Sequence, residues 1–160
     1  MLEFAKNLFL KNGSIEPTAI IYKRSGSPLV LDIRMEHKET EYQALNLLCQ
    51  SNDASQMIII SEAWLTLGAD NIQSPTPRKR EVLMLSTMNQ DGVTMNVFEI
   101  DRRPDGTVGL DEINLPTGLP GEDITQAGWL TEIFPSSPLP LSEKRKARKV
   151  AEMIRKKNRK

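Results

Sequence analysis

Apolar and polar residues alternate most regularly between Met57 and Arg103, and this stretch predicts the centre of the fold. Its strand-like runs follow one another closely: 57–67, 80–88, 93–102 and 107–115. Asp91-Gly92 separates the second run from the third, and Asp-Gly between alternating runs is a strong hairpin signal. Pro104-Asp105-Gly106 supplies the next turn. Strands joined by turns in this way predict an antiparallel meander.

Before this stretch, helical and strand patterns take turns along the chain. Apolar residues recur at spacings of three and four over 2–11 and 36–49, so we expect two amphipathic helices. Two short runs, 18–23 and 29–33, flank a Ser-Gly-Ser-Pro turn and predict a hairpin. We therefore expect an α+β fold, with a mainly antiparallel sheet of about five or six strands and both helices packed on one face.

Beyond residue 115 the chain changes character twice. Residues 116–141 are rich in proline but contain Trp129 and Phe134, which suggests a segment that docks rather than a free linker. Ser142 is a good N-cap and opens a basic stretch with a narrow apolar stripe. We divide the chain into an α+β domain at 1–115, a proline-rich docking segment or linker at 116–141, and a basic C-terminal helix or arm at 142–160.

Charge is distributed unevenly, although the whole chain has 21 basic and 21 acidic residues and no net charge. Residues 142–160 hold ten Lys or Arg and two Glu, a balance of +8, so the remainder carries −8. The sequence therefore predicts an acidic body with a basic arm. No apolar run approaches the roughly 18 residues of a membrane span, and no signal-peptide cleavage site is evident. We expect a cytoplasmic protein without membrane contact.

Motifs for several kinds of chemistry are missing. The single cysteine, Cys49, lies in the apolar run ALNLLCQ and is expected to be buried, and the single histidine, His37, lies in a charged helical turn. A zinc site of the Cys/His type therefore cannot form. The chain has neither a phosphate-binding glycine motif nor a nucleophile elbow. We expect no cofactor and lean against an enzyme, although carboxylates and arginines leave that question open.

One candidate site lies where Glu62 stands in the middle of a strand beside Trp64. A carboxylate in a cleft could hold a cationic or hydroxylated ligand, and an arginine from the following strand could hold an anion. The residues of this candidate ligand pocket are Ser61, Glu62, Trp64, Arg78 and Arg80. The competing interpretation is structural: if Met88 faces Val93 across the hairpin, Arg80 falls opposite Asp101 as an ordinary cross-strand ion pair.

The same stretch carries a resemblance. SEAW, then SPTPRKREVL, then a glycine-containing hairpin that ends in EIDR resembles small uncharacterised bacterial proteins over about residues 13–110. The resemblance implies a compact bacterial domain and brings no activity with it.

The second candidate site is the basic arm. Its cations could contact an acidic protein partner, the acidic body of this chain or of a second copy, or nucleic-acid phosphates without sequence preference. The residues expected at such a contact are Lys144, Arg145, Lys146, Arg148, Lys149, Arg155, Lys156 and Lys157. A disordered solubilising tail is the remaining alternative. The expected function is a binding or interaction module that forms a homo-oligomer, with a small-molecule or enzyme site at Glu62 as the alternative.

Overall fold

A six-stranded antiparallel sheet forms the body of the protein. The computed structural model describes residues 2–67, 78–113 and 132–159. Within these residues the strand order is β2-β1-β3-β4-β5-β6, and each neighbouring pair is antiparallel. The strands are β1 Thr18–Lys23, β2 Leu29–Asp32, β3 Ala54–Leu67, β4 Arg78–Asn89, β5 Gly92–Arg102 and β6 Val108–Ile113. The predicted α+β class and antiparallel sheet are confirmed.

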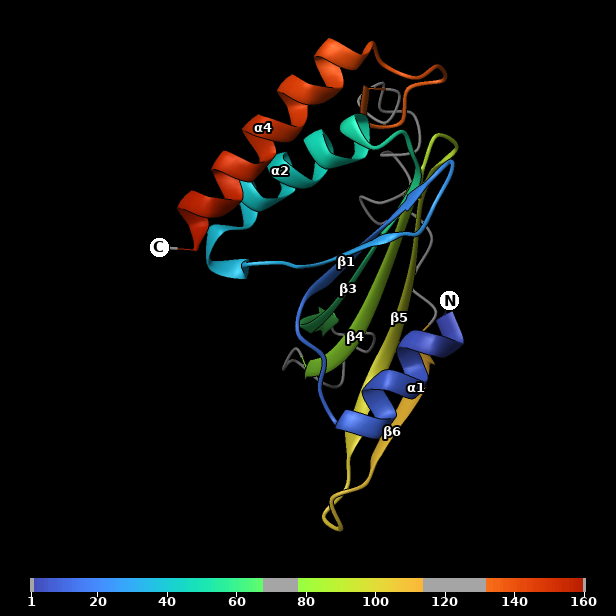
Figure 1. Cartoon of the computed structure of the whole chain (residues 1–160). Coiled ribbons are helices and arrows are strands. Elements are labelled where there is room, and N and C mark those ends of the chain that lie inside the picture. Colours follow the sequence, from blue (N-terminus) through green and yellow to red (C-terminus); the bar gives the residue numbers. More distant parts are fainter. Residues whose placement is uncertain (1, 68–77, 114–131, 160) are drawn as a thin grey trace.

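Helices lie at both ends of this sheet. Those described are α1 Leu2–Asn12, α2 Lys38–Ser51 and α4 Leu141–Asn158, and a short 3-10 turn, η1 Met35–His37, precedes α2. Figure 1 shows α4 running along α2 at one end of the sheet, with α1 beside β5 and β6 at the other. The part of the predicted docking segment at 116–131 and the last two residues of the predicted strand 107–115 lie outside the described residues.

The two faces of β3 carry separate cores, so the prediction that both N-terminal helices share one face is wrong. In one core, Ala5 and Phe9 of α1 pack against Ile58 and Ile60 of β3. In the other core, Leu45 and Cys49 of α2 pack against Met57 and Ile59, which lie on the opposite face of β3. Successive side chains of a strand point to opposite faces. Because Met57 to Ile60 are all apolar, both faces of β3 need a cover, and each receives its own helix.

The hairpin between β4 and β5 has the register that the sequence predicts. Met88 lies opposite Val93, and Val82 lies opposite Glu99. The side chain of Asn89 caps the turn, because its Oδ1 accepts hydrogen bonds from the backbone N–H of Asp91 at 2.8 Å and of Gly92 at 3.1 Å. The turn chemistry therefore determines which face each residue of these two long strands occupies.

α4 lies antiparallel to α2. Lys144 near its start forms an ion pair with Asp53, just after the end of α2, and Asn158 at its end donates a hydrogen bond to Glu41 near the start of α2. The residues of α4 that face the body include the small, buried Ala147 and Ala151, which allow the two helices to approach closely. One side of α4 is thus committed to the fold, and the other is left to solvent.

Candidate functional site

Glu62 is held by groups other than those in the predicted pocket. Its Oε1 accepts a hydrogen bond from the backbone N–H of Ile15 at 2.6 Å, and its Oε2 lies 3.3 Å from Nη2 of Arg102. Both contacts lie on the face of the sheet that α1 covers, because Glu62 follows Ile58 and Ile60 at a spacing of two. The carboxylate therefore fastens the segment that joins α1 to β1.

Arg80 lies on the opposite face of the sheet from Glu62. Residues paired across two strands lie on the same face of a sheet, so Glu62 shares a face with its partner Leu83 on β4. Arg80 precedes Leu83 by three positions, and residues an odd number apart on a strand point to opposite faces. Arg80 donates to Oε2 of Glu99 at 2.7 Å, so the predicted pair with Asp101 is not formed. Ser61 also points away from Glu62, and the Arg78 side chain lies outside the described part. The structure does not bring the five predicted pocket residues together.

Trp64 shares the face of Glu62 but covers little. Its side chain is 69 % exposed, beyond the end of the core that α1 contacts. This indole therefore shields Glu62 little from solvent, and the backbone of Ile15 provides the closer contact.

The arginine that Glu62 does meet is Arg102. It also donates two hydrogen bonds to Glu81, at 2.8 and 2.7 Å, and one to the carbonyl oxygen of Gly13 at 2.7 Å. The hydrogen bonds from Arg102 lower the pKa of Glu81, although partial burial opposes this. The sequence could have placed Arg102 on this face, because Phe98, Ile100 and Arg102 follow one another at a spacing of two. The contact with Gly13 could not be predicted, because only the folded chain brings Gly13 next to Arg102.

The inner side of α4 carries a polar network around Arg155. Its Nη2 donates to the carbonyl oxygen of Asp32 at 2.7 Å, and its Nε lies 3.3 Å from Oε2 of Glu41, whose side chain is almost completely buried. Arg159 lies 3.9 Å from Asp32, and Arg148 donates to Asn52 at 3.3 Å. These cations of the arm thus contact the chain's own body.

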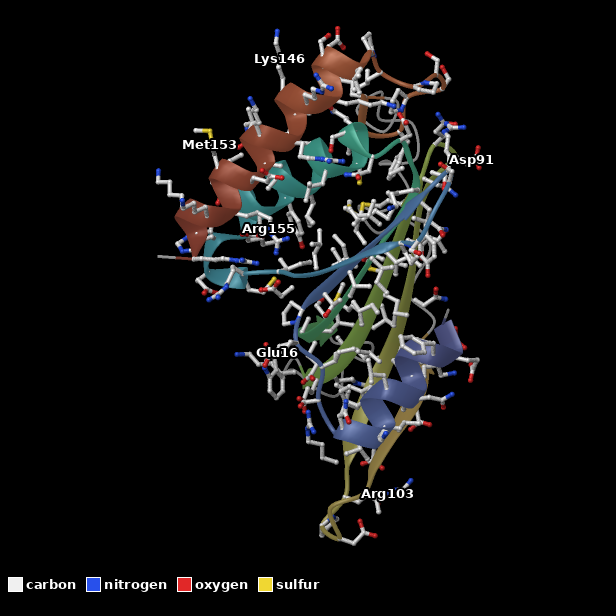
Figure 2. All side chains as sticks on the ribbon, viewed as in Figure 1. Glu16, Asp91, Arg103, Lys146, Met153 and Arg155 are labelled. Carbon is white, nitrogen blue, oxygen red and sulfur yellow. The ribbon has the colours of Figure 1, made fainter. Side chains whose placement is uncertain are left out.

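The outer side of α4 is cationic, and its cations form no ion pair with any described residue. Figure 2 shows Lys146 and Met153 pointing away from α2, whereas Arg155 points into the body. The exposed cations of α4 that form neither an ion pair nor a side-chain hydrogen bond within the described part of the chain are Arg145, Lys146, Lys149, Lys156 and Lys157. They span thirteen residues of helix, and the twelve steps from the first to the last cover about 18 Å at 1.5 Å per residue. We call these five cations with Met153 the outer face.

A second cationic region borders the outer face. A groove of about 660 Å³ between α4 and the β1–β2 hairpin is lined by cations from both sides. Its charged residues are Lys23, Arg148, Glu152, Arg155, Lys156 and Arg159. Lys156 belongs to both regions, so positive charge continues from the outer face around the end of α4.

In the part of the chain that the structure describes, groups suited to metal or nucleophilic chemistry do not lie together. No cluster of three or more His, Cys, Asp or Glu that could hold a metal occurs among the described residues. Cys49 is buried, and burial raises the pKa of its thiol to about 12. A thiol that stays protonated is a poor nucleophile. No helix in the described part is long and apolar enough to cross a membrane.

The comparisons with known proteins give no relative for this chain. No protein-family model matches it, and neither a curated protein nor a solved structure matches it significantly. The resemblance to small bacterial proteins thus stays an expectation, and any function has to be argued from the surface itself.

Proposed function

We propose that this protein is a non-enzymatic binding module that holds an acidic protein partner against the outer face of α4. The observation that carries the proposal is the set of five exposed cations that form neither an ion pair nor a side-chain hydrogen bond among the described residues. Arg155, Lys144 and Arg159 form ion pairs with the body of the chain, whereas the five outer cations stay available to a partner. An acidic body on a second copy of this chain is one partner of this kind.

The apolar content of the outer face favours protein over nucleic acid. Met153 is 70 % exposed and lies among the cations, because positions 146, 149, 153, 156 and 157 share one side of a helix. Val150 and Leu141 add exposed apolar surface at the margin. Flexible methionine side chains adapt to protein surfaces. A phosphate backbone has no comparable apolar surface against which Met153 could pack.

The direct test uses point substitutions rather than removal of the arm. Deleting residues 142–160 would also remove Arg155 and uncover α2, so loss of binding would not report on the outer face. The double variant Lys149→Gln/Lys156→Gln leaves the inner contacts of Arg155 and Lys144 in place. Its matched control is Lys11→Gln/Lys79→Gln, which removes two exposed charges elsewhere that also form no ion pair among the described residues.

The measurement is binding of a fluorescent peptide rich in Glu and Leu, together with the oligomer size of the protein by light scattering. Binding to the peptide, or self-association, that weakens in Lys149→Gln/Lys156→Gln but not in the control supports the proposal. Replacing Met153 by Gln should weaken the same contact. Binding and oligomer size that are equal in both double variants would show that the outer face is not the contact.

Nucleic acid is the second candidate, supported by the spacing of the cations along about 18 Å of helix. α4 has no aromatic residue for base stacking, so such binding would be non-specific. A labelled duplex and a labelled single strand, titrated over a salt series, distinguish this case. Five phosphate contacts predict a log–log salt slope of roughly −4. In that case Met153→Gln should leave binding unchanged.

A further inference from the structure

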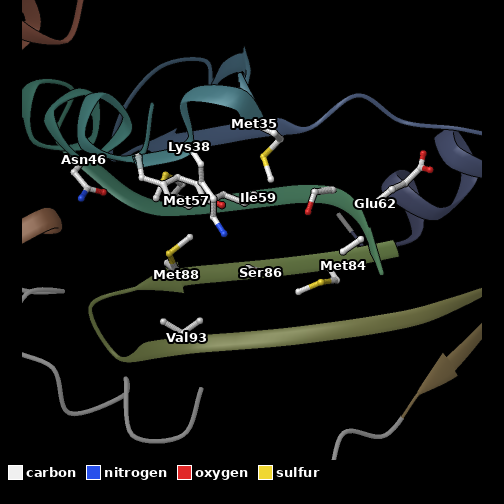
Figure 3. A pocket seen from close by; sticks show the side chains of 13 residues that line it. Met35, Lys38, Asn46, Met57, Ile59, Glu62, Met84, Ser86, Met88 and Val93 are labelled. Atoms are coloured by element: carbon white, nitrogen blue, oxygen red, sulfur yellow. The ribbon is translucent and has the colours of Figure 1, made fainter. Parts of the chain in front are cut away.

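An apolar groove opens between α2 and the sheet, away from both cationic regions. Its volume is about 420 Å³, within the range of roughly 300–1,000 Å³ that is usual for small-ligand sites. α2 and η1 form one wall, and β3, β4 and β5 form the floor (Figure 3). The groove exists because α2 covers only one end of this sheet face: its core contacts reach Met57 and Ile59 on β3, and Ser61 and Ala63 lie beyond them.

Methionine dominates the lining of this groove. Four of the seven methionines in the chain border it, from three different elements: Met35, Met57, Met84 and Met88. Unbranched thioether side chains fill irregular spaces and rearrange at low cost, which suits a ligand with a flexible apolar body. The remaining apolar lining includes Tyr42, Ile59 and Val93.

One charged group enters the groove. Of the two charged residues on its border, Glu62 directs its carboxylate away, toward Arg102 and Ile15, whereas the side chain of Lys38 reaches over β3 toward β4 (Figure 3). Lys38 forms no ion pair within the described residues; its Nζ lies 5.8 Å from the centre of the Tyr42 ring. An apolar groove with a single unpaired cation at its edge is complementary to an apolar molecule with a single negative group.

We propose that this groove binds an anionic amphiphile, such as a medium-chain carboxylate, with its head at Lys38 and its chain among the four methionines. Ser61 and Ser86 lie on the floor of the groove and can hydrogen-bond the second oxygen of the head group or a water beside it. This site is separate from the outer face of α4, so the two proposals can fail independently.

The test uses dodecanoate, with dodecanol as the uncharged match. Protein labelled with ¹³C at the methionine methyl groups is titrated with each compound below its solubility limit. The methyl signals of Met35, Met57, Met84 and Met88 should shift with dodecanoate, while that of Met153 on α4 should not. Dodecanol should cause the same pattern of shifts at roughly fivefold higher concentration, because an exposed ion pair contributes about 1 kcal/mol or less.

Two variants test the two halves of the site. Lys38→Gln should reduce the affinity for dodecanoate to that for dodecanol and leave dodecanol unchanged, and Lys11→Gln should change neither. Ser86→Phe should fill the floor and abolish binding of both compounds, with circular dichroism confirming that the variant is folded.

Three results would overturn the proposal. They are shifts that spread to Met153, equal affinity of wild type and Lys38→Gln for dodecanoate, and no shift of the four groove methionines at saturation. The last result would mean that the groove is closed to small amphiphiles in solution.

Discussion

Arg102 and Glu81 form a two-pronged ion pair across β4 and β5, with Nε at 2.8 Å from Oε2 and Nη2 at 2.7 Å from Oε1, although the residues lie 21 positions apart. The same guanidinium reaches Glu62 on β3 and the carbonyl oxygen of Gly13 at the end of α1. One side chain therefore connects three strands to the N-terminal segment. It does so on the face that carries α1, next to the ring of Phe9.

Replacing Arg102 by Met should lower the free energy of unfolding by about 1–2 kcal/mol. Its hydrogen bonds are charge-assisted, but its side chain is 42 % exposed, so water screens part of their energy. Urea unfolding of wild type and variant measures the loss. Arg103→Met is the matched control: the one ion pair that Arg103 forms within the described residues is with the exposed Asp101, and the change should stay within about 0.5 kcal/mol. Equal losses in both variants would contradict a clamping role for Arg102.

Stability should fall in acid partly because of Glu81. Its pKa in the folded protein is lowered by the hydrogen bonds from Arg102, relative to a usual value of 4.5. A carboxyl whose folded pKa is depressed stabilises the fold above its unfolded pKa, and this contribution is lost as the pH falls through the folded pKa. Glu81→Gln should therefore be less stable than wild type at pH 7, and the difference should shrink below about pH 4.5. A difference that is constant with pH would refute this linkage.

Arg155→Met should be the most damaging change in α4. It leaves the buried carboxylate of Glu41 without its cation, and breaking a buried pair in this way costs about 3–5 kcal/mol. Glu41→Gln retains an acceptor for Asn158, so the double variant Arg155→Met/Glu41→Gln should recover part of the loss. Thermal unfolding of the four proteins gives the coupling energy. Additive losses would show that the two residues act independently.

Cys49 should resist thiol reagents in the native protein. Burial raises the pKa of its thiol to about 12 and also blocks access, and its Sγ contacts the Sδ of Met57 at 3.8 Å within the core. Iodoacetamide at pH 8 should therefore modify it at a rate that follows transient unfolding, and quickly in urea. Mass spectrometry of the quenched reaction gives the rate. Rapid modification of the native chain would show that the packing of α2 on the sheet is looser than described.

Local patterns predicted the sheet well because their causes are local. Asn89 to Gly92 contain the side chain and the glycine that the turn needs, so the pairing of Met88 with Val93 followed from a few residues. The burial of Cys49 followed from the apolar periodicity around it. In contrast, Arg80 was assigned to Asp101 from register alone, whereas its long side chain reaches diagonally to Glu99. A strand register places Cα atoms and leaves the choice between neighbouring partners to rotamers.

The sequence by itself determined which residues form strands and helices, because hydrophobic period and turn chemistry act over a few neighbours. It also determined that positive charge gathers at the C-terminal end. Only the tertiary structure decided how that charge is divided: docking of α4 on α2 turns Arg155 toward Glu41 and leaves Lys149 in solvent. It likewise placed Glu62 with Arg102 rather than Arg80, and left the groove beside Lys38 open. These outcomes depend on how separate elements pack, and the energies of such long-range contacts are not encoded in any single stretch of the chain.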